Sequence, residues 1–186
     1  MPLVFWSTIF IGGIMTQGYS HLKNYVSELG MRGTTTQYLF TAGLVLGGIL
    51  TILFVVGLIK TSKSKGINTI PLYLLFFWGV SMAGAGLFPG PSDLHSISGL
   101  IGFPILLSPI LALILWRKTS IPKLKLFGFI TLFFFALSFL GMIPETLENY
   151  PGLLAMFAHS AWSIWFIYLS FSFLSLEKNN KAINKV

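Results

Sequence analysis

The chain has 186 residues, of which 54% are hydrophobic and only 9% are charged; a soluble domain carries roughly 25% charged residues, so this composition excludes an ordinary soluble globule. The net charge of +7 does not indicate a nucleic-acid partner, because no basic surface with interleaved aromatic residues is evident. The chain has no cysteine, which excludes disulfides, thiolate metal sites and cysteine nucleophiles.

Six apolar segments account for most of the chain. They run over residues 2–17, 35–59, 69–88, 95–116, 124–143 and 152–175. Crossing about 30 Å of hydrocarbon takes roughly 20 helical residues, a length that five of the segments reach. The first segment is short, because its apolar character ends near Gln17. The sequence therefore predicts an all-α fold in which residues 1–186 form one integral membrane domain, a polytopic transmembrane bundle of about six helices.

The basic residues alternate between the two sides of this bundle. Ten of the twelve follow the second, fourth and sixth segments: Lys60, Lys63, Lys65, Arg117, Lys118, Lys123, Lys125, Lys178, Lys181 and Lys185. The opposite side carries Lys23 and Arg32, together with four of the five acidic residues: Glu28, Asp93, Glu145 and Glu148. Because cytoplasmic loops are enriched in Lys and Arg, we expect both termini inside, in a multi-pass protein of the cell (cytoplasmic) membrane.

Small residues and prolines predict how the helices pack. Small residues recur along the second and third segments: Gly43, Gly47, Gly48, Gly79, Ala83 and Gly84. Such residues let helix backbones approach closely in lipid. Pro104 and Pro109 are expected to kink the fourth helix near its middle.

The polar residues that could carry chemistry gather on the outer side, which holds all three histidines: His21, His95 and His159. Residues 18–30 contribute His21, Ser27 and Glu28, and the apolar spacing there predicts a short helix lying in the membrane interface. Residues 84–99 end the third helix with Pro and Gly. Ser92 or Asp93 is then a suitable N-cap for the fourth helix.

The two remaining histidines occupy different depths in the predicted bundle. His95 falls in the first turn of the fourth helix, where it faces headgroups or an outer cavity. His159 lies about 10 Å beyond the start of the last helix. It is the ionisable residue placed most clearly inside a membrane helix, and such residues are functional candidates by default.

The residue spacing gives limited support to specific chemistry. Asp93, His95 and His159 are weak metal-ligand candidates, but no HExxH or HxxxH spacing places two ligands on one helical face, so we expect no metal. Residues 96–99 lack the leading glycine of a GxSxG nucleophile motif. A haem shared by His95 and His159 is disfavoured by the difference in their depths, and no cofactor is predicted. Transport stays open, since kinked, glycine-rich helices are common in transporters.

Two outer motifs carry a resemblance to a known family. The first is Tyr19-Ser20-His21 leading to Ser27-Glu28-Leu29-Gly30. The second comprises Gly86, Phe88, Pro89, Asp93, His95 and Gly99. Together they resemble the bacterial and archaeal membrane family filed as domain of unknown function 998. The resemblance covers essentially the whole chain and implies six helices, but it implies no activity. At His159 the resemblance implies an arginine or a similar polar residue, so the chain departs from the family there.

We expect a non-enzymatic bundle in a lipid bilayer whose outward-facing polar surface binds a lipid, a small ligand or a partner protein. The candidate residues are His21, Ser27, Glu28, Asp93, His95 and His159. The alternative is a membrane-embedded hydrolase, metal- or serine-dependent, that acts at the outer leaflet. An enzyme requires these side chains to converge around a cavity. The sequence is also compatible with an oligomer.

Overall fold

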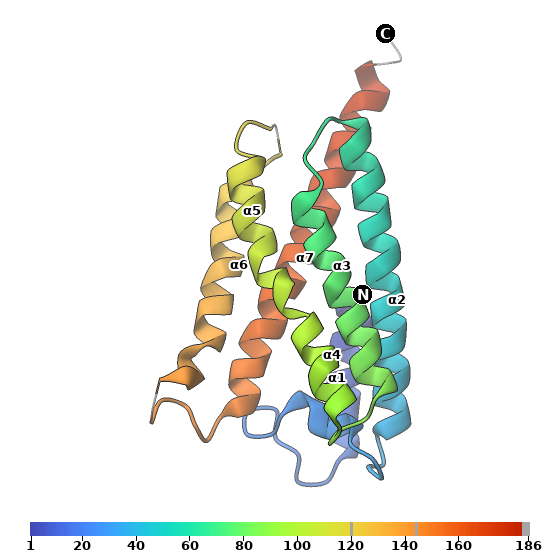
Figure 1. Ribbon diagram of the computed structural model, residues 1–186, viewed down its shortest axis with the longest axis vertical. Helices are drawn as coiled ribbons and strands as arrows, with labels where there is room; N and C mark the ends of the chain where they lie inside the picture. Colours follow the sequence, from blue (N-terminus) through green and yellow to red (C-terminus); the bar gives the residue numbers. More distant parts are fainter. Residues whose placement is uncertain (120, 144, 184–186) are drawn as a thin grey trace.

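The computed structural model describes residues 1–119, 121–143 and 145–183, with side chains up to residue 177. All regular structure within these ranges is helical (Figure 1), which confirms the predicted all-α bundle. The α-helices are α1 (Pro2–Met15), α2 (Gln37–Ser64), α3 (Ile70–Leu87), α4 (Asp93–Ile101), α5 (Leu107–Leu115), α6 (Leu124–Ser138) and α7 (Pro151–Ile183). Three short 3₁₀ turns join them: η1 (Val26–Gly30), η2 (Phe103–Leu106) and η3 (Leu140–Met142). Lys185 and the side chains of Lys178 and Lys181 lie outside the described residues.

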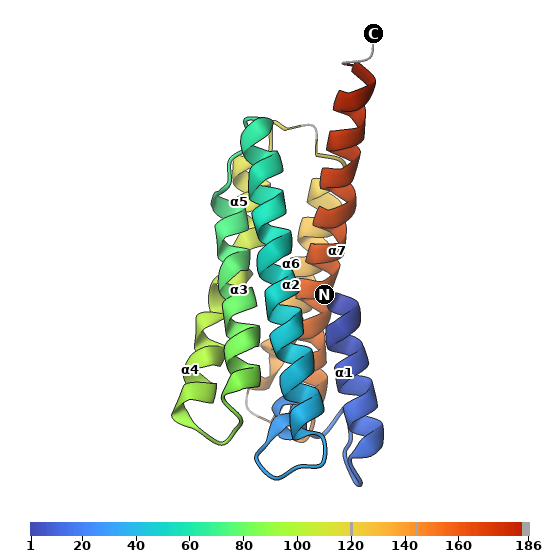
Figure 2. The same ribbon diagram turned by 90° about the vertical axis from the view of Figure 1, so that its right-hand side faces the viewer.

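Five helical segments are long and apolar enough to cross a membrane. They are Gln37–Ser64, Ile70–Leu87, Asp93–Leu115, Leu124–Met142 and Pro151–Glu177. The sixth apolar helix, α1, has 14 residues, which corresponds to about 21 Å. Figure 2 shows that it accompanies α2 over only half of the bundle, with the N-terminus at mid-height. There the Thr51 hydroxyl donates to Sδ of Met1 at 3.3 Å.

The connections between helices separate into two groups at opposite ends of the bundle (Figure 1). One end carries η1, the α3–α4 connection and the α6–α7 connection. The other carries the α2–α3 and α5–α6 connections together with the end of α7. All three histidines belong to the half of the bundle at the first end, which we call the outer end after the orientation that the charges predict.

Helices α2 and α3 pack almost backbone to backbone. A Cβ atom on Gly48 would lie 2.6 Å from the carbonyl oxygen of Gly79. A Cβ atom on Gly79 would lie 2.9 Å from Cγ1 of Ile52. Apolar burial does not drive helix association in lipid, where the surroundings are equally apolar, so close van der Waals contact of this kind holds the pair together.

The fourth span is interrupted where the sequence predicts a kink. Helix α4 ends at Ile101 and η2 contains Pro104. Pro109 instead lies in the first turn of α5, where a missing N–H costs no helical hydrogen bond. The interruption redirects the chain: α4 packs on α3, whereas α5 packs on both α3 and α6. In Figure 1 the span accordingly crosses from α3 at the outer end toward α6 at the inner end.

The predicted orientation can be tested by cysteine labelling, since the natural chain contains no cysteine. We expect Lys23→Cys to react with a membrane-impermeant maleimide in intact cells. Lys63→Cys, in the last turn of α2 at the opposite end, should react only after permeabilisation. The reverse pattern would show that the bundle is inserted the other way round.

The contact between α2 and α3 predicts that Gly48→Leu destabilises the protein. The added side chain has no space, and overpacking of this kind costs typically about 1–3 kcal/mol. The measurement is thermal unfolding in detergent. Gly57→Leu on the same helix is the matched control, because a Cβ atom there meets nothing within 4 Å. Equal melting temperatures for the two variants would contradict this account of the packing.

Candidate functional site

Glu28 holds the first outer connection together. Its Oε1 accepts a hydrogen bond from the backbone N–H of Tyr25 at 2.7 Å, and its Oε2 accepts one from Nδ2 of Asn24 at 2.8 Å. Burial and then the Glu28 charge raise the pKa of Tyr19 to about 12, so that phenol stays protonated. The predicted interfacial helix is reduced to the single turn η1, which this carboxylate caps. Both oxygens of Glu28 therefore act in local structure.

His21 is packed away from the other candidate residues. Its ring meets Phe10 and Tyr19 edge-on, with centroids 5.2 and 5.1 Å apart. The neighbouring Leu22 carbonyl accepts a hydrogen bond from the backbone N–H of Leu153 at 3.0 Å. These contacts attach the first outer connection to the start of α7, so His21 contributes to the support of the site rather than to its lining.

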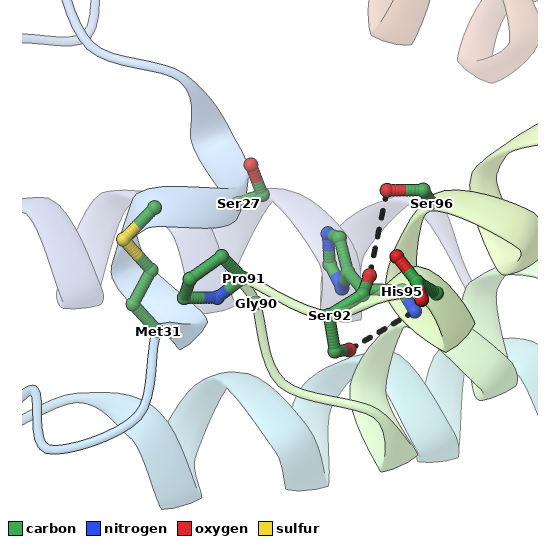
Figure 3. Close-up of a pocket in the computed structure, with 8 residues that line it drawn as sticks. Ser27, Met31, Gly90, Pro91, Ser92, His95 and Ser96 are labelled. Atoms are coloured by element: carbon green, nitrogen blue, oxygen red, sulfur yellow. Dashed lines mark hydrogen bonds between the residues drawn. The ribbon is translucent and has the colours of Figure 1, made fainter.

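Ser92 caps α4 and positions His95. The Ser92 hydroxyl accepts a hydrogen bond from the backbone N–H of His95 at 3.2 Å (Figure 3), so Ser92 rather than Asp93 is the N-cap. Asp93 lies exposed in the first turn, where a negative charge suits the helix dipole. Nδ1 of His95 lies 2.9 Å from the carbonyl oxygen of Phe88. Because a carbonyl only accepts, we assign the proton to Nδ1, which leaves Nε2 free.

His159 takes the opposite tautomer. It lies eight residues into α7, about 12 Å from the start of that helix. The indole N–H of Trp162 donates to its Nδ1 at 3.2 Å, so Nδ1 carries a lone pair and Nε2 carries the proton of the neutral ring. The ring also packs against Phe5, with centroids 4.6 Å apart. The two histidines thus offer complementary groups: a lone pair on His95 and an N–H on His159.

Three adjoining hollows occupy the outer half of the bundle. The vestibule, of about 460 Å³, is lined by Ser27, Met31, Gly90, Pro91, Ser92, Asp93, His95 and Ser96 (Figure 3). The central cavity, of about 290 Å³, is lined by Phe5, Tyr25, Val26, Ser27, Phe40, Leu44, Trp78, Ser81, Met82, Ala85, His95, Gly99, Ala155 and His159. The lateral cleft, of about 420 Å³, runs between α4–η2 and the outer parts of α6, η3 and α7.

The three hollows share parts of their walls. Ser27 and His95 line both the vestibule and the central cavity. Tyr25, Trp78, Gly99 and Ala155 line both the central cavity and the lateral cleft. The three hollows therefore adjoin one another, from the polar outer end of the bundle to its side.

The structure brings together four of the six candidate residues. Ser27, His95 and His159 line the central cavity, and Asp93 lines the vestibule beside it. In the part of the chain that is described, no three His, Asp or Glu side chains lie close enough together to hold a metal ion. The groups that lie together around the central cavity are therefore a hydroxyl and two imidazole rings.

The sequence analysis missed several residues of this site. Trp78 and Ser81 line the central cavity, and Trp162 sets the tautomer of His159. The available signal was spacing: residues three apart share one helical face, as Trp78 does with Ser81. Nothing in that spacing shows which neighbouring helix the face meets.

Comparison with known proteins supports the resemblance seen in the sequence. The family model described as Protein of unknown function (DUF998) matches residues 1–172. No curated protein and no solved structure matches the chain. The matched range includes every residue that lines the three hollows.

The role of Glu28 predicts that Glu28→Gln destabilises the protein. An amide provides one acceptor oxygen where the carboxylate uses two, so one donor loses its partner, at a cost of about 1.5–3 kcal/mol for a hydrogen bond to a charged group. We expect a melting temperature several degrees lower in detergent. Glu177→Gln, an exposed change near the inner end, is the control. No difference between the two variants would show that the cap is dispensable.

Proposed function

The chain belongs to the family described as Protein of unknown function (DUF998), and, because that description assigns no activity, we propose a function from its geometry. We propose that the outer half of this membrane protein binds an amphiphilic lipid. The polar end of the lipid lies in the vestibule and central cavity, and its apolar part lies in the lateral cleft.

The observation that carries this proposal is the change from polar to apolar walls across the three adjoining hollows. The vestibule presents mainly small polar side chains and backbone from the α3–α4 connection. The lateral cleft is walled mainly by apolar side chains such as Phe103, Ile105 and Leu154. Ligand sites in proteins are typically hollows of about 300–1,000 Å³ with a few placed polar groups, and a change from polar to apolar walls matches a lipid entering from the bilayer.

The interruption of the fourth span supports lateral entry. Since α4 follows α3 and only α5 reaches α6, the outer half of the bundle is left open between α4 and the α6–α7 pair. Phe103 and Met142, which line this opening, are 56% and 78% exposed. In a bilayer such side chains face acyl chains, so a lipid tail passes them without entering water.

The geometry gives the hydrolase alternative no comparable support. Within the described residues no serine hydroxyl hydrogen-bonds to a histidine ring, the arrangement that activates a serine nucleophile. Instead, Nδ1 of His95 is hydrogen-bonded to the carbonyl oxygen of Phe88, and Nδ1 of His159 to the indole N–H of Trp162. Binding is therefore the function that these contacts favour.

The proposal predicts that Gly99→Leu displaces the bound lipid. Gly99 lines both the central cavity and the lateral cleft, and a Cβ atom there meets nothing within 4 Å. The leucine side chain is thus accommodated, but it occupies ligand space. Native mass spectrometry of the protein released from mild detergent should show at least about a tenfold loss of bound lipid, which corresponds to about 1.4 kcal/mol.

Gly57→Leu is the control, because its Cβ also meets open space and lies away from the hollows. It should retain lipid at the level of the unmodified protein. If neither variant loses lipid, or if the unmodified protein carries none under any condition, the proposed binding site is wrong.

A further inference from the structure

The central cavity collects hydrogen-bonding groups that have no partner. Several polar atoms on its lining residues form no hydrogen bond to any described residue, among them Ser27 Oγ, Ser81 Oγ, His95 Nε2 and His159 Nε2. The indole nitrogen of Trp78, in the wall shared with the lateral cleft, is fully buried and also unpaired. Unpaired polar groups are costly in the hydrocarbon layer, where water is scarce. Two further buried hydroxyls, those of Ser62 and Thr131, are unpaired away from the three hollows. Around the central cavity, however, several such groups lie together, which indicates an occupant with polar atoms.

Ser81 is the most informative of these groups. Several serines in this bundle donate to a carbonyl three or four residues earlier, as Ser138 does to Phe135 at 2.7 Å and Ser98 does to Leu94 at 2.7 Å. That bond satisfies a hydroxyl inside a membrane helix. Ser81 is 5% exposed and makes no such bond to a described residue. Its hydroxyl remains available at the wall of the central cavity.

The charges around the three hollows restrict the occupant further. Among the described residues, the central cavity and the lateral cleft are lined by no Asp, Glu, Lys or Arg, and the vestibule is lined by Asp93 alone. Phosphate and carboxylate groups are held by Arg, Lys or clustered backbone N–H donors. The N-terminus of α4 lies in the vestibule, but Asp93 already places a carboxylate in its first turn and repels a second anion. An anionic headgroup does not fit these walls, whereas an uncharged one does.

The tautomers of the two histidines indicate which polar atoms of a ligand fit the central cavity. His159 offers Nε2–H, which needs an acceptor oxygen deep in the cavity. Nearer the vestibule, Nε2 of neutral His95 accepts from a hydroxyl, and Ser27 either donates or accepts. Phe5 and Trp78 flank the His159 ring, with ring centroids 4.6 and 6.4 Å away. They leave the deep end otherwise apolar.

We propose that the lipid bound here is uncharged, with a carbonyl or hydroxyl oxygen in its head that accepts a hydrogen bond from Nε2–H of His159. This inference rests on the proposed function. Glycerides and isoprenoid quinones are two sources of the same chemistry: both combine a neutral, oxygen-bearing head with long apolar chains.

The experiment compares three probes on the full-length protein in detergent: a diacylglycerol, a short-chain isoprenoid quinone and phosphatidylglycerol. Binding is followed by native mass spectrometry and by the thermal shift that each probe produces. We expect at least one uncharged probe to bind at least about tenfold more tightly than phosphatidylglycerol. Whether the glyceride, the quinone or both bind distinguishes the two sources.

Variants then connect the preference to His159. His159→Phe keeps a ring but removes the donor, so the favoured probe should bind at least about tenfold more weakly. His159→Gln, which retains an N–H donor, should recover part of the affinity. Ser81→Ala gives an independent variant with a smaller expected loss, in case the His159 changes impair folding. Tyr38→Phe, which removes a polar group from an exposed ring outside the three hollows, should leave binding unchanged.

The outcomes separate this inference from the proposed function. If lipid binding is lost in Gly99→Leu but the protein prefers phosphatidylglycerol, the site exists and the inference about its ligand is wrong. The same conclusion follows if His159→Phe and Ser81→Ala both bind the uncharged probes normally. If none of the three probes binds, both the inference and the proposed function are overturned.

Discussion

A bilayer offers no water to the groups buried within it, and this constraint underlies the whole structure. Backbone N–H and C=O groups must be paired within the protein, which is why each apolar segment becomes a helix. The same absence of water removes the hydrophobic drive for helices to associate, so α2 and α3 depend on the close approach at Gly48 and Gly79. Polar side chains are subject to the same constraint: many donate to a carbonyl or cap a helix, and several of those without a partner gather around the central cavity.

The break at η2 shows how one local irregularity produces a site. A continuous fourth helix would follow a single neighbour along its length. Instead, Gly102 packs tightly on α3, where a Cβ atom would lie 2.7 Å from Oγ of Ser81, and Pro104 follows directly in η2. The inner half then turns toward α6 while the outer half stays with α3. The space left between α4 and α7 becomes the lateral cleft, with Trp78 and Gly99 at its inner wall.

The outer polar residues divide into two groups by the way their hydrogen bonds are used. Glu28 and Ser92 satisfy backbone donors at the start of η1 and α4, and they hold the outer connections in place. His95 and His159 each form one hydrogen bond within the protein through Nδ1, and Nε2 of each ring remains free. The first group supports the site, and the second gives it hydrogen-bonding character. Because the free ring nitrogens of His95 and His159 are unpaired, they can form new hydrogen bonds to a ligand, whereas Glu28 and Ser92 already have their partners.

Hydropathy and proline position determined the architecture from the sequence alone, because the length of an apolar run and the loss of one N–H act locally. They predicted six apolar helices, the short first one, and the interruption near Pro104. The gathering of histidines and acids at one end was equally visible. The structure decided which of those residues meet. Glu28 and His21 looked as promising as His95, yet one became a cap and the other packs on Phe10. His95 and His159, expected at different depths, line one cavity. Helical spacing specifies which residues share a face, but the faces that meet are set by how α3, α4 and α7 pack, and that is a property of the assembled bundle.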